Sequence, residues 1–440
     1  MKSKKDQTAF SLNRRKFLSI AGMAAASGLT ASPIWAKEES SELDIINQDA
    51  KTLDISGLKS DLIPESQIAT VMETKVIANQ PGRHLGTGTE YGVNTHMHPV
   101  ITKRVIESDR YMGWPTLART RSGELIVAVS GDRDAHVCPW GKTQIIRSKD
   151  QGKTWSDPEV INNTPLDDRD AGVIETKKGT LVVSWFTSVA FTLPIYRTAY
   201  ERYARIAEKI TPEIRKQWLG NWVRRSEDGG KTWLEPVRTV ATAPHGPIQL
   251  RDGRLLYIGT GRWNGKSGIV IEESADDGQT WNVITTISKS TDIADDASLS
   301  EPHMVELASG KLIAMVRHEP KDRQCFLLQS ESTDGGKSWS PLYKTGIWGY
   351  PPHLIQLKNG LVVVTYGYRL APYSERACIS RDEGRTWDIE NQITLANALG
   401  PDMGYPSSVQ LDDDSILTAY YQAAKAGGPT VLHSTHWRLK

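Results

Sequence analysis

An octapeptide repeat constrains the fold of this 440-residue chain more than any other feature. The pattern Ser-x-Asp-x-Gly-x-Thr/Ser-Trp occurs five times, as SKDQGKTW (148–155), SEDGGKTW (226–233), SADDGQTW (274–281), STDGGKSW (332–339) and SRDEGRTW (380–387). These residues suit a hairpin turn, because Ser and Asp side chains bond turn backbone, Gly accepts a positive φ, and Trp can pack beneath. A calcium loop does not fit, since only one carboxylate position recurs. We therefore interpret the boxes as structural.

Two strand-like runs joined by a short polar turn precede each box, and a sixth pair follows the last box. The six pairs span residues 114–130, 172–186, 246–260, 303–317, 353–367 and 407–421. Short apolar strands and turn signals at a spacing of roughly 50 residues are typical of four-stranded blades. The sequence therefore predicts an all-β, six-bladed propeller. Because the sixth pair lies near the C-terminus, we expect the early strand ATVMETKVIA (69–78) to close the last blade.

The boxes are not evenly spaced. Their tryptophans are separated by 78, 48, 58 and 48 residues, and the first interval contains YRTAYERYARIAEKITPEIRKQWLG (196–220). Strong helix formers in this stretch predict a helical insertion in the second blade, either a lid over the site or a surface decoration. Residues 37–68 are polar and acidic, which indicates a linker or arm, and residues 69–440 form the predicted propeller.

The N-terminal region predicts export. NRRKFL (13–18) precedes a weakly apolar run that ends at Ala36, and a twin-arginine pair in this context resembles a Tat-type signal peptide covering residues 1–36. We expect an exported protein, periplasmic or secreted, without a membrane span in its mature form. The 53 basic and 52 acidic residues balance, which argues against a nucleic-acid partner. The three cysteines are too few for a disulfide framework.

Propeller geometry predicts which face carries the chemistry. The A–B turns and the boxes between strands C and D share one face, so the starts of A strands and the ends of B strands share the other. Two similar charge clusters, GDRDAH (131–136) and DDRDAG (167–172), fall on that second face in neighbouring blades. We therefore expect the site there, with a glycan or polysaccharide as the partner.

The boxes and strand pairs together resemble the sialidase superfamily over about residues 69–440. Three motifs carry the resemblance into the site: SEPHMVEL with IAMVRHE, GYPSSVQL, and LIVAVSGDR. The resemblance implies Glu301 as general base, Arg317 as a carboxylate-binding arginine, Tyr405 as nucleophile and Arg133 as a site arginine. The alternative for Arg133 is an ion-pair network that braces its loop.

A further carboxylate-binding arginine is implied at Arg376, with Arg369 as the second choice. The family's first blade begins with Arg-Ile-Pro, whereas this chain has Gly113-Trp114-Pro115, so one arginine of the family's triad is missing. Arg169 is a candidate replacement, and Trp114 is a candidate for stacking on a sugar.

The family's catalytic aspartate has no clean match either. The loop DRDAHVCPWGK offers Asp134, Asp132 and His136 as candidate acid/base residues. Three further histidines, His245, His303 and His353, stand at the start of successive A strands. They suit packing or sugar contacts, and the alternative is a three-imidazole metal site. We expect neither a metal nor a cofactor.

The favoured interpretation is an exported exo-glycosidase of sialidase type that acts on a terminal acidic sugar. A carboxylate beside the anomeric carbon repels a carboxylate nucleophile, whereas a phenol that passes its proton to a Glu avoids the repulsion. The runner-up is a polysaccharide lyase on the same scaffold, in which Arg neutralises a uronate and His removes the C5 proton. The third possibility is a glycan-binding propeller without catalysis.

Overall fold

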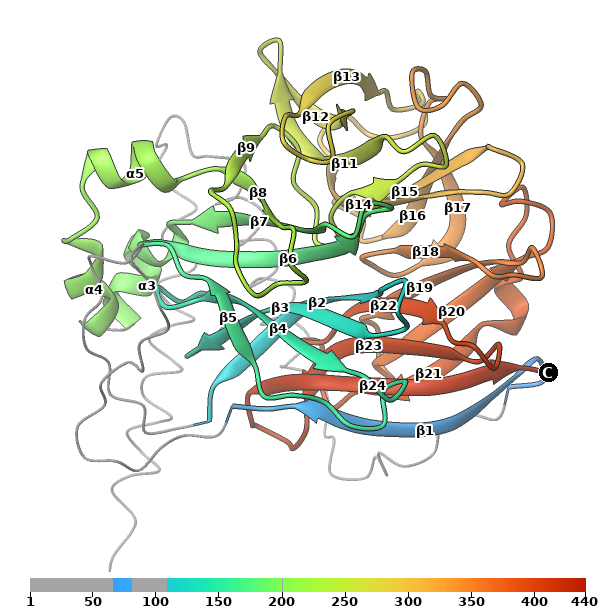
Figure 1. Ribbon diagram of the computed structural model, residues 1–440, viewed down its shortest axis with the longest axis horizontal. Coiled ribbons are helices and arrows are strands. Elements are labelled where there is room, and N and C mark those ends of the chain that lie inside the picture. The colour runs from blue at the N-terminus through green and yellow to red at the C-terminus, as the bar shows by residue number, and fades with distance from the viewer. Residues whose placement is uncertain (1–65, 81–108, 200) are drawn as a thin grey trace, which may run out of the picture.

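The computed structural model describes residues 66–80, 109–199 and 201–440. The predicted signal peptide and all but the last three residues of the predicted linker lie outside the described residues. In the described part the strands form six four-stranded antiparallel sheets arranged as the blades of a propeller, which confirms the predicted fold class (Figure 1). Strands of a blade are called A to D in chain order below.

The first three blades contain the following strands. Blade one has β2 (Tyr111–Arg119), β3 (Leu125–Arg133), β4 (Lys142–Ser148) and β5 (Glu159–Asn162). Blade two has β6 (Asp167–Glu175), β7 (Leu181–Ser188), β8 (Asn221–Ser226) and β9 (Val237–Thr239). Blade three has β10 (Ile248–Gln249), β11 (Leu255–Trp263), β12 (Lys266–Ser274) and β13 (Asn282–Ile287).

The last three blades follow the same plan. Blade four has β14 (Ser298–Glu306), β15 (Leu312–Glu319), β16 (Phe326–Ser332) and β17 (Tyr343–Trp348). Blade five has β18 (His353–Gln356), β19 (Val362–Tyr368), β20 (Ser374–Ser380) and β21 (Ile393–Asn397), with a 3-10 turn η2 (Ile389–Asn391) before its last strand. Blade six has β22 (Gly404–Gln410), β23 (Ile416–Ala423) and β24 (Thr430–Leu439), with β1 (Ala69–Ala78) as its outer strand.

Closure of the ring depends on the early strand β1. It pairs antiparallel with β24 from Ala69 opposite Leu439 to Ala78 opposite Leu432. This confirms that the segment 69–78 supplies the strand that the last repeat lacks. Joining the two ends of the propeller in one sheet removes the free edge that β24 would otherwise present.

The boxes have the structural role predicted for them. In the first box the Ser148 hydroxyl accepts the Gly152 amide at 2.8 Å, and Asp150 accepts both the amide (2.9 Å) and hydroxyl (2.6 Å) of Thr154. Gly152 has a φ of +85°, and the Trp155 indole donates to its carbonyl at 3.1 Å. The same Ser, Asp and Gly contacts recur in the other four boxes, so the repeated Ser and Asp side chains serve the turn.

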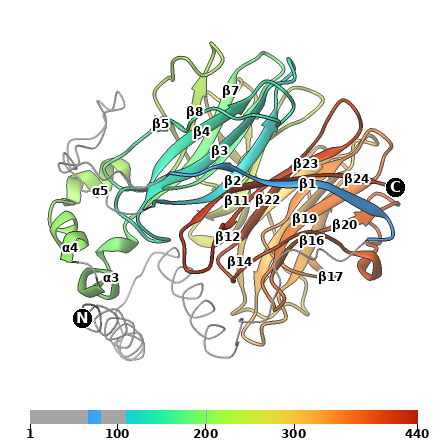
Figure 2. The same ribbon diagram turned by 90° about the horizontal axis from the view of Figure 1, so that it is seen from below.

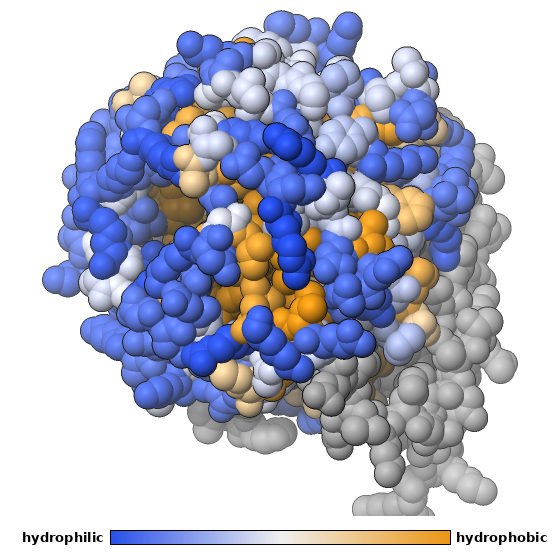
Figure 3. All heavy atoms as spheres, turned by 90° about the vertical axis from the view of Figure 1, so that its right-hand side faces the viewer, coloured by the Kyte–Doolittle hydropathy of each residue, from blue (hydrophilic) through white to orange (hydrophobic). Residues whose placement is uncertain are grey.

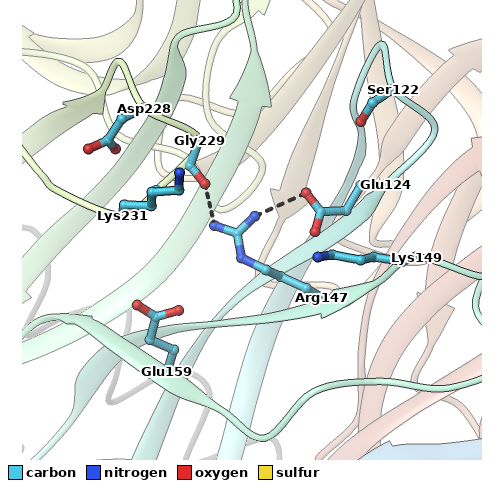
Figure 4. Close-up of a pocket in the computed structure, with 9 residues that line it drawn as sticks. Ser122, Glu124, Arg147, Lys149, Glu159, Asp228, Gly229 and Lys231 are labelled. Atoms are coloured by element: carbon cyan, nitrogen blue, oxygen red, sulfur yellow. Dashed lines mark hydrogen bonds and ion pairs between the residues drawn. The ribbon is translucent and has the colours of Figure 1, made fainter.

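Neighbouring blades are joined on the box face. Arg147 of β4 lies 3.2 Å from Glu124 and donates at 2.9 Å to the carbonyl of Gly229 in the second box (Figure 4). A hollow of about 630 Å³ lies around this joint, and charged side chains of both signs line it. Figure 3 shows the whole face, where a hollow with apolar surface is surrounded by hydrophilic side chains. The joint belongs to blade packing, on the side opposite the predicted site.

The predicted helical insertion lies between β7 and β8 of the second blade, as expected. It consists of a 3-10 turn η1 (Ala190–Thr192) and helices α3 (Pro194–Ala199), α4 (Glu201–Ala207) and α5 (Pro212–Trp218) (Figure 2). Thr211 caps α5 by accepting the Ile214 amide, with Pro212 in the first turn. Across the described ranges, no helix has the length and apolarity needed to cross a membrane.

The insertion packs on the loop that carries the first charge cluster. Tyr203 of α4 meets the indole of Trp140 edge-on, with ring centroids 5.6 Å apart. Val137, Cys138 and Phe191 are buried in the same apolar cluster. The helices therefore support the 131–141 loop from outside.

Candidate active site

The A strands of four blades begin with the same unusual backbone conformation. Trp114, Asp170, Glu301 and Tyr405 occupy equivalent positions and have φ values of 58°, 48°, 47° and 54°. Each lies within a break in the A–B register, where the two strands slip relative to each other. A left-handed conformation costs free energy for residues other than Gly, and such residues cluster at functional sites. The repeat therefore places four large or charged side chains at one level of the ring.

Tyr405 and Glu301 form the centre of the site, although 104 positions separate them. The Tyr405 hydroxyl donates a short hydrogen bond to one Glu301 oxygen, and Arg317 binds the other oxygen at 2.7 Å. Arg317 also lies 3.4 Å from the Tyr405 oxygen, and its Nε lies 2.9 Å from Glu319. The structure thus brings together the predicted nucleophile, its predicted base and one predicted arginine.

The second arginine beside this centre is Arg369. Its guanidinium carbon lies 5.8 Å from the Tyr405 ring centroid, and its Nε donates to the Met403 carbonyl at 3.1 Å. Arg376, the first choice from the sequence, lies within strand β20, where it stacks on Tyr368 at 3.4 Å and bonds Ser374. These contacts of Arg376 stay within blade five, whereas Arg369 follows strand B at the predicted functional end. The structure therefore places the second choice, and not the first, beside Tyr405.

The first charge cluster braces its loop. Arg133 and Asp167 form a fully buried ion pair at 2.6 Å, and a second nitrogen of Arg133 bonds Asp167 at 2.8 Å. The Arg133 guanidinium also donates to the carbonyls of Ala135 and His136. Burial lowers the Arg133 pKa, but Asp167 outweighs burial and the net shift is upward. These contacts correspond to the bracing alternative for Arg133 rather than to a residue exposed to a ligand.

Two aspartates of this loop differ in their surroundings. Asp132 is buried between two cations, Lys142 at 2.6 Å and Arg110. That pairing suits an ion-pair network better than a proton donor. Asp134 is partly exposed, and its backbone amide lies 3.3 Å from the sulfur of Cys138. The loop places its third candidate, His136, in a polar network instead.

His136 connects several elements around the site. Its Nδ1 lies 3.1 Å from the Tyr111 hydroxyl and 3.5 Å from Asp402, and its Nε2 lies 3.3 Å from an Arg169 nitrogen. Asp402 also accepts hydrogen bonds from the hydroxyls of Tyr111 (3.0 Å) and Tyr421 (3.1 Å). The sequence analysis missed Asp402; its only signal is its place three residues before Tyr405, near the start of an A strand.

Trp114 occupies the place of the missing arginine and is completely buried. It therefore does not present a ring face for a sugar to stack on. The Arg169 guanidinium lies 4.4 Å from the Trp114 ring centroid, and the rings of Tyr405 and His136 approach the same indole edge-on at 6.4 and 4.9 Å. Arg169 thus contacts both Trp114 and His136, and its role as a replacement arginine stays a prediction.

The three A-strand histidines pack on one another. The His303 and His353 rings stack at 4.3 Å, and His245 meets them edge-on at 5.5 and 4.9 Å. All three are buried, so they do not face a ligand as predicted sugar contacts would. Burial lowers their pKa values, to about 3 for His303.

The hydrogen bonds of these histidines do not suit a metal. The Nδ1 atoms of His303 and His353 accept backbone amides of Leu354 (2.9 Å) and Ser408 (3.3 Å), so in the neutral rings Nε2 carries the proton. A protonated nitrogen does not ligate a metal. Within the part of the chain that the structure describes, no group of His, Cys, Asp and Glu is arranged to hold a metal ion.

Comparisons with known proteins place this architecture. The BNR repeat-like domain family matches residues 208–419. A protein of unknown function from Dyadobacter fermentans has the same fold, with a TM-score of 0.66, 22% identity, and coverage of 84% of this chain and 99% of that one. The chain therefore has the fold of a six-bladed propeller of the sialidase type, and its residues 208–419 match a BNR repeat-like domain.

Solved sialidases share the fold of this propeller at low identity. The intramolecular trans-sialidase from Ruminococcus gnavus, in complex with oseltamivir carboxylate, is 15% identical, with a TM-score of 0.52 and coverage of 74% of this chain and 94% of that one. The Trypanosoma rangeli sialidase in complex with the inhibitor DANA is 16% identical, with a TM-score of 0.54 and coverage of 85% and 60%. No curated protein matches the propeller in sequence. These similarities concern the fold.

Proposed function

We propose that this propeller is an exo-glycosidase of sialidase type that hydrolyses a terminal acidic sugar, sialic acid or a related sugar, from glycans. One observation carries the proposal: the Tyr405 hydroxyl donates to Glu301 while Arg317 binds the same carboxylate. A phenol whose proton already points at a carboxylate is prepared to become a nucleophile. The twin-arginine segment at residues 14–15 supports export as a further part of the proposal.

The surrounding charges fit an anionic sugar. The guanidinium carbons of Arg317 and Arg369 lie 4.3 and 5.2 Å from the Tyr350 ring centroid, and both arginines are close to Tyr405. A guanidinium binds a carboxylate through two parallel hydrogen bonds, so the pair would orient the sugar with its anomeric carbon at the phenol. Tyr405 would attack that carbon, its proton would pass to Glu301, and water would then release the sugar.

The test compares wild type with Tyr405→Phe on sialosides. We expect free sialic acid from the wild type and a loss of about 10³-fold or more in the variant, because the nucleophile is removed. Tyr366→Phe is the matched control, since the Tyr366 hydroxyl bonds Gln392 in blade five at 2.6 Å, away from Glu301. Hydrolysis that persists in Tyr405→Phe would contradict the proposal.

A polysaccharide lyase is the second candidate, and Trp114 is the observation that favours it. Because Trp114 replaces an arginine, fewer cations are left to bind the carboxylate of a sialic acid. His136, which contacts Trp114 and Arg169, could act as the base that removes the C5 proton of a uronate. Incubation with uronate-containing polysaccharides decides between the two. Ultraviolet absorbance from an unsaturated uronate would identify a lyase, and binding of glycans without turnover would identify a recognition protein.

A further inference from the structure

The network around His136 fixes its tautomer. An arginine guanidinium has only donors, so the Arg169 nitrogen 3.3 Å from Nε2 must donate and Nε2 must hold a lone pair. The ring proton of the neutral imidazole is then on Nδ1. Tyr111 donates its own proton to Asp402 at 3.0 Å, which leaves its oxygen free to accept Nδ1–H at 3.1 Å. Every bond in the chain thus has one donor and one acceptor.

Asp402 is the charged carboxylate at the end of this series of hydrogen bonds. Two tyrosine hydroxyls donate to the same oxygen, and Nδ1 of His136 lies 3.5 Å from it. Burial raises the Asp402 pKa, but its hydrogen bonds with His136 and Tyr111, the charge of Arg369 and the charge that His136 carries when protonated outweigh burial, so the net pKa shift is downward. A fixed carboxylate behind Nδ1 sets the tautomer and supports a positive charge that develops on the ring.

His136 and the proposed nucleophile Tyr405 contact the same side chain, Trp114. Both rings approach the Trp114 indole edge-on, and Asp402 stands three residues before Tyr405. The His136 side chain retains 12% exposure and the Asp402 side chain 31%. A residue with a lone pair, a fixed tautomer and partial access, which contacts the same indole as the nucleophile, has the features of a proton-transfer group.

We propose that His136 transfers protons in this site through Nε2 and that Asp402 is its positioning residue. The proposal rests on the proposed glycosidase function. In the first step imidazolium Nε2–H protonates the leaving oxygen while the Tyr405 oxygen bonds to the anomeric carbon and its proton goes to Glu301. In the second step water bonds to that carbon, Nε2 takes the water proton, and Tyr405 leaves and recovers its proton from Glu301. The neutral ring with its proton on Nδ1 is the base form in this cycle.

Arg169 is the contact that must change during this cycle. While it donates to Nε2, that nitrogen has no room for a proton, so the acid form requires the guanidinium to turn away. A sugar carboxylate is the partner that would draw it. Binding of the anionic substrate would thereby allow Nε2 to take up a proton from solvent water, which converts His136 from base to acid.

The tautomer is tested without reference to activity. Nitrogen-15 spectra of the full-length protein distinguish the two tautomers, and His136→Gln identifies the signals of His136. We expect the Nδ1–H tautomer in the wild type and a mixture in Asp402→Asn, whose amide no longer presents two charged acceptors. Tyr366→Phe should leave the spectrum unchanged. An Nε2–H tautomer in the wild type, or no change in Asp402→Asn, would overturn the proposal.

The chemical role is tested with two substrates of different leaving group. An aryl sialoside with an acidic phenol needs little protonation, whereas sialyllactose needs it fully. The hydrolysis rate of sialyllactose should fall about 10²-fold or more in His136→Gln, and that of the aryl sialoside should fall much less. Asp402→Asn should show the same difference between substrates, with a loss on sialyllactose smaller than that of His136→Gln. Equal losses on both would overturn the role. If the wild type hydrolyses neither, the glycosidase proposal fails, while the spectra still decide the tautomer and the role of Asp402.

Discussion

At the scale of single residues, the two arginines that sequence reasoning weighed against each other make a matched pair. Arg369 lies beside Tyr405, and Arg376 stacks on Tyr368 within blade five. We expect Arg369→Gln to lower kcat/KM for an anionic sugar about 10- to 150-fold, the equivalent of about 1.5–3 kcal/mol for a charge-assisted hydrogen bond. Steady-state kinetics on a sialoside measure this, with Arg376→Gln as the control. A larger loss in Arg376→Gln would reverse the assignment.

The buried pair of Arg133 and Asp167 makes a prediction about stability. Neither side chain is exposed, so removing one partner leaves an uncompensated charge in the interior. Arg133→Met should reduce the free energy of unfolding by about 3–5 kcal/mol, because Asp167 remains buried. Urea denaturation measures the change, and Arg133→Met with Asp167→Asn should recover part of it. A stable Arg133→Met that has lost only substrate affinity would instead support the ligand-contact role.

The sequence predicted some of the residues that the structure brings together and missed others, for a physical reason. Glu301 and Tyr405 hold equivalent positions relative to the A–B turns, so the repeat itself marks them. Asp402 has no such mark, because it lies in an irregular segment before β22 and its partner Tyr111 reaches it only after the first and last blades close on each other. Arg133 shows the converse, since a pattern that resembles a site arginine serves a buried ion pair.

At the scale of elements, the insertion and the 131–141 loop depend on each other. Tyr203 of α4 packs on Trp140, and both are buried in one apolar cluster with Phe191. We expect Tyr203→Ala to destabilise this cluster by about 3–5 kcal/mol, the usual cost of removing a buried aromatic ring. Because the same loop carries His136, local loosening should accompany lower activity. Hydrogen exchange of residues 131–141 measures the loosening.

The control for the insertion lies in another blade. Tyr257→Ala removes a buried ring from blade three, where it meets Trp281 at 6.0 Å. It should lower overall stability without selectively raising exchange in the 131–141 loop. Similar exchange of that loop in both variants would show that the insertion is a decoration. The helices themselves were predictable from local propensity, whereas their packing partners were not, because they belong to a different blade.

At the scale of the whole molecule, the sixfold repeat is the feature that made the closed ring predictable from the sequence. Each box, turn and strand pair is a local pattern, and six copies leave a closed ring as the consistent arrangement, including the use of residues 69–78 to complete the last blade. Contacts between side chains of different blades form only when the ring closes, so no local sequence pattern predicts them. His245, His303 and His353 meet only because three blades converge, which the sequence suggested by register alone.

These converging histidines make the folded molecule sensitive to acid. Their pKa values are lowered by burial in the folded state, whereas an unfolded histidine has a pKa of about 6.5. Above pH of about 6.5 both states are neutral, so the histidines cause no pH dependence. As the pH falls below that value, the unfolded chain binds protons at these histidines and the folded state does not. For His303 this difference in proton binding persists until the pH approaches its folded pKa of about 3. Stability is therefore lost on acidification.

Urea midpoints between pH 7 and pH 5 measure this loss. One pH unit below the pKa of an unfolded histidine, we expect each buried histidine to have lowered the free energy of unfolding by about 1.4 kcal/mol relative to neutral pH. His303→Gln removes one of the three groups, so its stability should fall less steeply than that of the wild type, whatever its stability at pH 7. The Asp carboxylates of the boxes have lowered pKa values and keep their charge in this range, so they do not contribute to the difference. Parallel pH curves for wild type and His303→Gln would contradict the prediction, because they would mean that His303 binds protons equally in both states.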